Sequence, residues 1–217
     1  MGIAFFDMDG TLVDGDTNDI SLHFYVQKGL IEESYLEPLE EMGRQFFLGK
    51  VDINAVAEFA CKPLVGMPKE TREKLLEECV REHIAPRFKS GALKTVKWHN
   101  DHNNACVIVT STNDYLVRHV ADALGIKYII ASPMEQDKNG ILTGERNGVI
   151  PYQQYKVTRI KEFMREHKFS TDDSWAYGDS VNDVPMLLIA KHGVAVDPTP
   201  SMREHPCFNR LSEEHWI

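Results

Sequence analysis

Residues 3–13 of the chain read Ile3-Ala4-Phe5-Phe6-Asp7-Met8-Asp9-Gly10-Thr11-Leu12-Val13. The apolar run at the start predicts a buried strand, and the Gly-Thr pair bends the chain away after it. Two carboxylates therefore lie just past the end of that strand. Held a few ångströms apart, they repel each other by about 4 kcal/mol at an effective dielectric constant of about 20. A fold accepts that cost where a cation or a proton neutralises the pair, so this turn is a candidate functional site.

Two ordinary interpretations of this turn have to be weighed. It could begin a calcium loop, but Val13 and Asn18 occupy positions where such a loop needs Asp or Asn and Glu, and the predicted element before it is a strand rather than a helix. It could also be a plain polar turn. The motif alone leaves that second alternative open.

The composition is that of an ordinary globular protein: 217 residues, 42% hydrophobic and 26% charged. This length allows one core with a smaller insert. The net charge of -9 argues against nucleic-acid partners and anionic membrane surfaces. We also find no apolar run of about 18 residues and no signal peptide, so we expect a cytoplasmic protein with no membrane span. The spacing of the cysteines predicts reduced, structural thiols: Cys61, Cys79, Cys106 and Cys207.

Two stretches of the chain differ in their pattern. Residues 16–85 have helical periodicity and lack a convincing strand, whereas residues 86–217 alternate strands with helices. Such alternation predicts an α/β fold, a Rossmann-like doubly wound parallel sheet with helices on both faces. We therefore predict one domain from residues 1–15 and 86–217, with the helical segment 16–85 inserted after the first strand.

Ligands of parallel sheets bind at the carboxyl ends of the strands. The strand predicted at 105–110 ends in Thr110 and Ser111, and the helix predicted from about 154 to 167 carries Lys156 near its start. The strand predicted at 174–177 leads into Gly178-Asp179-Ser180-Val181-Asn182-Asp183.

Each of these features taken singly has a more ordinary explanation, such as a helix cap, a solvated lysine or a common turn. Their agreement at successive strand ends favours a shared site. Four aspartates with a hydroxyl and a lysine suit magnesium-assisted phosphoryl transfer, because Mg²⁺ prefers carboxylate and phosphate oxygens. A lysine and a hydroxyl can orient the phosphate, and a carboxylate can act as the nucleophile.

The order of these motifs resembles that of the haloacid dehalogenase (HAD) superfamily, whose motifs are Asp-x-Asp-x-Thr, a Thr or Ser after a strand, a Lys, and Gly-Asp-x-x-x-Asp. The resemblance covers essentially the whole chain. It implies that Asp7 is the nucleophile and Asp9 the general acid and base. It also implies a Mg²⁺ ion held by Asp7, Asp179 and Asp9, the last through its backbone carbonyl.

The same resemblance assigns the remaining motif residues. Thr110 or Ser111 and Lys156 would bind the phosphate, with Thr110 preferred because it directly ends the apolar run. Asn182 and Asp183 would be supporting residues.

Within the superfamily, the helical insert at 16–85 looks like the cap of phosphoserine phosphatases and the related histidinol-phosphatase-like group. Phosphoserine phosphatases carry a Glu where Asp16 stands, and a cap Arg that has no clear counterpart here, although Arg44 could replace it. The resemblance therefore implies a phosphatase acting on a small amine-bearing phosphorylated metabolite, with L-histidinol phosphate preferred over phosphoserine. A non-catalytic relic that binds phosphorylated ligands is the alternative from another class. We expect a monomer or weak homodimer.

Overall fold

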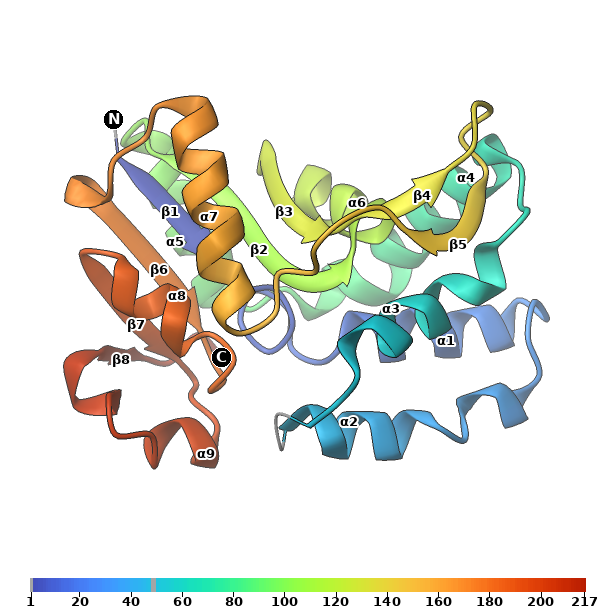
Figure 1. Ribbon diagram of the computed structural model, residues 1–217, viewed down its shortest axis with the longest axis horizontal. Coiled ribbons are helices and arrows are strands. Elements are labelled where there is room, and N and C mark those ends of the chain that lie inside the picture. Colours follow the sequence, from blue (N-terminus) through green and yellow to red (C-terminus); the bar gives the residue numbers. More distant parts are fainter. Residues whose placement is uncertain (1, 48–49) are drawn as a thin grey trace.

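A six-stranded sheet forms the centre of the molecule, in the order β3-β2-β1-β6-β7-β8 (Figure 1). The computed structural model describes residues 2–47 and 50–217. All neighbouring strands in this sheet are parallel, which confirms the predicted α/β class. The strands are β1 (Ile3–Phe6), β2 (Ala105–Asn113), β3 (Tyr128–Ser132), β6 (Ser174–Gly178), β7 (His192–Val196) and β8 (Ser212–Glu214).

Helices cover both faces of the sheet because successive side chains of a strand point to opposite faces. Ile3 and Phe5 belong to one buried cluster with apolar residues of α7 and α8, whereas Ala4 and Phe6 belong to the cluster that includes α5 and α6. The helices of these two layers are α5 (Ser90–Asp101), α6 (Asp114–Leu124), α7 (Gln154–His167) and α8 (Val184–Ile189), and a short α9 (Pro200–Arg203) follows β7.

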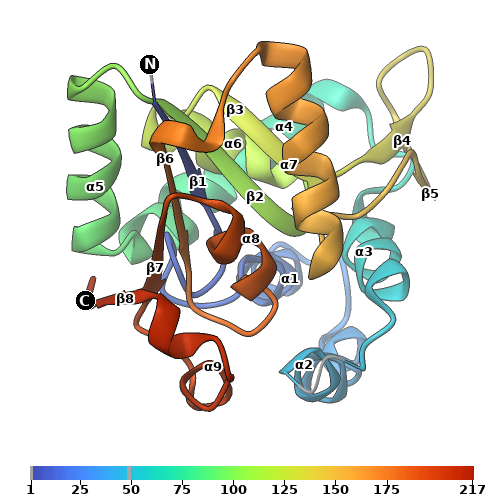
Figure 2. The same ribbon diagram turned by 60° about the vertical axis from the view of Figure 1, so that its left-hand side comes forward.

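Between β1 and α5 the described residues form helices and turns but no strand, as predicted. Figure 1 shows α1, α2 and α3 beyond the carboxyl ends of the strands, with α2 farthest from the sheet, and Figure 2 shows the same order. The division of the chain into 1–15 with 86–217 and 16–85 stays a prediction. The helices of the insert are α1 (Thr17–Gln27), α2 (Leu39–Phe47), α3 (Ile53–Cys61) and α4 (Lys69–Cys79).

A separate two-stranded sheet forms from β4 (Met134–Gln136) and β5 (Leu142–Arg146), which pair antiparallel. Two details of the main sheet differ from expectation. Strand β2 was expected to end at Thr110 but continues to Asn113, because it pairs with β3 as far as Ser132. Strand β8 was not predicted. Among the described residues, no helix is both long and apolar enough to cross a membrane.

Candidate active site

Asp7, directly after β1, forms a buried ion pair with a lysine from the other half of the chain. The Lys156 ammonium, on the first turn of α7, donates to Asp7 Oδ1 at 2.6 Å and to Asp183 Oδ1 at 2.6 Å. The Lys156 side chain is only 3% exposed. Thr11 Oγ1 donates to the other oxygen of Asp7 at 3.2 Å. The fold thus places one fixed positive charge between two carboxylates at the end of β1.

A third carboxylate completes an acidic cluster. One oxygen from each of Asp7, Asp179 and Asp183 lies within 4.8 Å of the others. The turn after β1 comes very close to this cluster, because a Cβ on Gly10 would stand 2.5 Å from Asp179 Oδ2, and Gly10 has φ +80. Only glycine fits this position without strain. The potential metal-binding atoms of this cluster are all oxygens, and its three carboxylates carry more negative charge than Lys156 neutralises. The cluster therefore suits a hard divalent cation such as Mg²⁺.

Burial and the excess negative charge of the acidic cluster raise the pKa values of Asp7 and Asp179. Burial and the neighbouring Asp183 carboxylate raise the pKa of Asp7 to about 7, against the lowering effect of Lys156. Burial, Asp183 and Asp7 also raise the pKa of Asp179 well above its usual value. Burial acts to lower the pKa of Lys156, but the attraction of Asp183 and Asp7 prevails and raises it. A bound divalent cation would favour the ionised carboxylates and oppose these upward shifts.

These shifts predict how stability depends on pH without metal. A carboxylate whose pKa is raised on folding binds more protons in the folded than in the unfolded state, so the free energy of unfolding falls as pH rises from about 4 to about 7. In EDTA, the Tm should therefore fall over this range, and saturating Mg²⁺ should restore it more at pH 7.5 than at pH 5. Calorimetry with and without Mg²⁺ measures this, with Asp179→Asn as the variant expected to lose part of the slope. An equal effect of Mg²⁺ at both pH values would contradict a metal site at this cluster.

The side chain of Asp9 turns away from the acidic cluster. Its Oδ1 accepts from the backbone N–H and the hydroxyl of Thr17 at 2.7 and 2.6 Å, where α1 begins. Its Oδ2 accepts from the hydroxyls of Thr112 at 2.7 Å and Thr110 at 3.3 Å. Asp9 is therefore a separate carboxylate that joins the start of the helical insert to strand β2.

The hydroxyl-bearing residues of β2 all line the cavity above Asp7. Because β2 continues past them, Thr110 and Ser111 lie inside a strand, so the prediction that the strand ends at these residues was wrong. Thr110 is 1% exposed, and its hydroxyl contacts Asp9. Thr112 was not singled out from the sequence, although its alternation with Thr110 along one strand could have indicated it.

The loop after β6 supplies the supporting residues. Asp183 accepts on Oδ2 from the Ser180 backbone N–H at 3.1 Å and the Ser180 hydroxyl at 2.9 Å, which fixes the carboxylate that holds Lys156. Asn182 is buried at the cavity wall, and its Oδ1 accepts from Gln153 at 3.2 Å. Its Nδ2 has no hydrogen-bond partner among the described residues. An unpaired buried N–H group is costly, so this donor is suited to a ligand.

One cavity of about 570 Å³ connects these residues to the helical insert. Asp16 lines it and caps α1 by accepting from two backbone N–H groups. Although its side chain is open to the cavity, the surrounding protein and the nearby Asp9 raise the pKa of Asp16 to about 7. Arg44 is not among the lining residues. It is exposed on α2 and donates to both oxygens of Glu41, at 2.8 and 2.6 Å.

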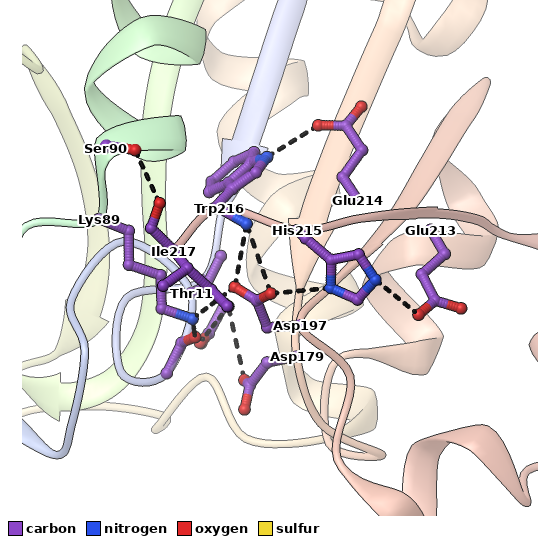
Figure 3. A network of polar contacts seen from close by, with 12 residues as sticks. Thr11, Lys89, Ser90, Asp179, Asp197, Glu213, Glu214, His215, Trp216 and Ile217 are labelled. Atoms are coloured by element: carbon purple, nitrogen blue, oxygen red, sulfur yellow. Dashed lines mark hydrogen bonds and ion pairs between the residues drawn. The ribbon is translucent and has the colours of Figure 1, made fainter.

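A network of hydrogen bonds and ion pairs stabilises the turn after β1 (Figure 3). Lys89 Nζ donates to the Gly10 carbonyl at 2.6 Å and to Asp197 Oδ2 at 2.9 Å. Asp197 in turn accepts from the backbone N–H of Trp216 at 3.2 Å and contacts His215 at 3.1 Å. Thr11 reaches Asp179 at 3.4 Å in the same view. The loop after β7 and residues 215–216 thus brace the turn that carries Asp7.

Removal of the Asp197 carboxylate should destabilise the fold. Asp197→Ala leaves Lys89, which is 10% exposed, without its charged partner. A hydrogen bond to a charged group contributes about 1.5–3 kcal/mol, so we expect the free energy of unfolding to fall by about 2–3 kcal/mol. Urea unfolding measures this, and Asp101→Ala, at an exposed helical ion pair, is the control expected to change it by less than about 1 kcal/mol. Equal effects of the two variants would contradict the bracing role.

Comparison with known proteins identifies the family. The family model described as haloacid dehalogenase-like hydrolase matches residues 4–188. The chain belongs to this family. It is a HAD phosphatase, as its phosphatase-named relatives also indicate. A histidinol-phosphatase of Neisseria meningitidis is 27% identical over 206 residues, which are 93% of each chain. A phosphoserine phosphatase of Mycobacterium tuberculosis is 29% identical over 209 residues, 92% of this chain and 66% of that protein.

Solved structures share the fold. A protein of unknown function from Bordetella pertussis superposes with a TM-score of 0.90 at 25% identity and covers 100% of this chain and 99% of its own. A phosphoserine phosphatase, in a structure described as a phospho-aspartyl intermediate analogue, superposes with a TM-score of 0.67 at 23% identity, over 93% and 89% of the two chains. The family match over residues 4–188 thus confirms the predicted resemblance to the HAD superfamily, and these structures agree with its fold.

Proposed function

We propose that this HAD phosphatase is a Mg²⁺-dependent phosphomonoester hydrolase that works through an aspartyl phosphate on Asp7. The observation that carries the proposal is the contact of Asp7 with Lys156 at 2.6 Å, at the base of a cavity that also holds Asp179 and Asp183. A carboxylate oriented by a fixed cation can attack a phosphoryl group that the same cation attracts. Mg²⁺, held by Asp7, Asp179 and the Asp9 carbonyl, would neutralise charge on the phosphate.

The chain's own residues can perform both halves of the reaction. An Asp7 oxygen attacks phosphorus, the ester P–O bond breaks, and Asp9 gives its proton to the departing alkoxide. Asp9 then takes a proton from the water that attacks phosphorus, which frees phosphate and restores the Asp7 carboxylate. Thr17 and Thr112 support this role of Asp9, because they hold its carboxylate apart from the acidic cluster.

Four residues are suited to hold the phosphate during these steps. Lys156 supplies the charge, and Thr110 and Ser111 line the same cavity. The unpaired Nδ2 of Asn182, in the loop after β6, adds a hydrogen-bond donor. A relic that only binds phosphorylated ligands is disfavoured, because the motif residues expected of the enzyme are all present.

The substrate we propose is a small phosphate ester with an amine, of which L-histidinol phosphate is the preferred candidate. Among the described residues lining the cavity there is no arginine, and Lys156 is the only lysine, so a substrate carboxylate would find neither an arginine nor a lysine there beyond the phosphate site. Asp16 and Asp19 present carboxylates to the same space. The name of the Neisseria relative agrees with this choice. Phosphoserine stays the alternative, with Arg44 as the cation it would need.

A panel of phosphate esters with Mg²⁺ tests the proposal: L-histidinol phosphate, phosphoserine and p-nitrophenyl phosphate. We expect the highest kcat/KM for L-histidinol phosphate. Asp16→Asn should lower that value roughly 10- to 100-fold, the effect of losing one hydrogen bond to a charged group, and leave p-nitrophenyl phosphate unchanged. Arg44→Ala is the matched control with no expected effect. A preference for phosphoserine that Arg44→Ala abolishes would refute the amine-only substrate.

A further inference from the structure

The cavity continues from the acidic cluster into an apolar chamber made by the insert. Six partly exposed apolar side chains from the turn before α2, from α2 and from α3 line it. These residues, which define the apolar chamber, are Leu36, Leu39, Met42, Ile53, Val56 and Phe59. Apolar side chains that face one open space, with polar groups at its rim, mark a site for an apolar ligand group.

One wall of the apolar chamber is the ring of Phe59, which packs against Tyr35. Tyr35 stacks on Phe59 with ring centroids 4.5 Å apart, and its hydroxyl donates to the Phe59 carbonyl at 2.7 Å. The Phe59 side chain is therefore fixed by packing while part of it stays open to the cavity. A pre-positioned ring of this kind favours a flat or branched apolar partner.

The rim between the acidic cluster and the apolar chamber is negatively charged. Asp16 and Asp19, from the start of α1, both line the cavity. His23 lies one turn further along α1, with Nδ1 2.9 Å from the Asp19 carbonyl oxygen and 3.3 Å from its carboxylate. Because Thr17 contacts Asp9, this rim begins directly beside the reacting groups, whereas α2 is the part of the insert farthest from the sheet (Figure 1).

We propose that the alcohol part of the substrate carries an ammonium close to the phosphate ester and a ring or branched apolar group beyond it, which fills the apolar chamber. This inference rests on the proposed function and adds the class of leaving alcohol. A volume of about 570 Å³ lies within the range that encloses drug-sized ligands, and a polar ester as small as phosphoserine leaves the apolar chamber filled only with water.

Three esters with the same amino-alcohol backbone test the inference: L-alaninol, L-histidinol and L-phenylalaninol phosphate. We expect kcat/KM for L-phenylalaninol phosphate to exceed that for L-alaninol phosphate on the order of 10-fold or more, since only the former reaches the apolar chamber. L-Histidinol phosphate should also exceed L-alaninol phosphate. Val56→Trp, which fills the apolar chamber, should lower kcat/KM for the ring-bearing esters far more than for L-alaninol phosphate and so remove their advantage. Ala55→Trp, exposed on the same helix, is the matched control.

The outcomes distinguish a failure of this inference from a failure of the proposed phosphatase function. Equal kcat/KM for L-alaninol and L-phenylalaninol phosphate would overturn the apolar chamber as a substrate site while leaving the phosphatase intact. A uniform loss in Val56→Trp, with Ala55→Trp unaffected, would also overturn it, because a structural defect does not discriminate between esters. No release from any of the three esters would overturn the proposed amine-bearing substrate class and this inference together. The comparison of esters on the unmodified protein stands even if Val56→Trp fails to fold.

Discussion

Asp7→Asn is expected to lower kcat by a factor on the order of 10⁴ or more for every phosphate ester that the protein hydrolyses. The amide cannot form the acyl phosphate, and no other carboxylate among the described residues has both the Lys156 contact and a place at the end of β1. Phosphate release under saturating Mg²⁺ measures the loss. The variant should still fold, since an amide can accept a hydrogen bond from Lys156.

Asp179→Asn is the informative companion variant for this experiment. It removes a proposed metal ligand but keeps the Asp7–Lys156 contact, so its activity should rise with increasing Mg²⁺, whereas Asp7→Asn should stay inactive at any concentration. If Asp7→Asn kept more than about 1% of the activity, direct attack by water would replace the covalent mechanism.

Lys156→Met should destabilise the protein and reduce catalysis together. The lysine is 3% exposed and bonds two carboxylates, and removal of one partner of a buried ion pair costs about 3–5 kcal/mol. The free energy of unfolding should fall more at pH 8 than at pH 5, because protonation relieves the unpaired carboxylates at the lower pH. We expect kcat to fall on the order of 10²–10³-fold, as when one charge-stabilising donor is lost.

Lys156→Arg separates the two effects of this substitution. It keeps the charge, so most of the stability should return, whereas the larger guanidinium cannot occupy the position between Asp7 and Asp183 with the same geometry. Unfolding in urea at both pH values gives the stability, and phosphate release gives kcat. A fully stable and active Lys156→Met would contradict the central place of this ion pair.

Asp7, Thr110 and Asp179 could be assigned to strand ends because each follows a short run typical of a buried strand, whereas Lys156 was placed near the start of a predicted helix. Asp7, Lys156, Asp179 and Asp183 come together as expected, since parallel strands share one carboxyl edge. Strand β8 could not be foreseen, because its three residues are exposed and polar and owe their conformation to pairing with β7.

The hydroxyl groups around Asp9 could not be predicted from the sequence for a different reason. Thr17 and Thr112 reach one carboxylate from a helix start and a strand 95 residues apart, so only the packing of the insert on the sheet brings them together. The Arg44 side chain pairs with Glu41 on an exposed face of α2. Helical periodicity does not reveal this pairing, so the sequence did not show that Arg44 lies away from the cavity lining.

The most direct measurement is to trap the covalent intermediate. The protein is quenched during turnover of a phosphate ester, treated with borohydride to reduce an acyl phosphate to the alcohol, and digested for mass spectrometry. We predict homoserine at position 7, dependent on both substrate and Mg²⁺ and absent from Asp7→Asn. Reduction at Asp179 or Asp183 instead, or none at all in protein that is releasing phosphate, would contradict Asp7 as the nucleophile.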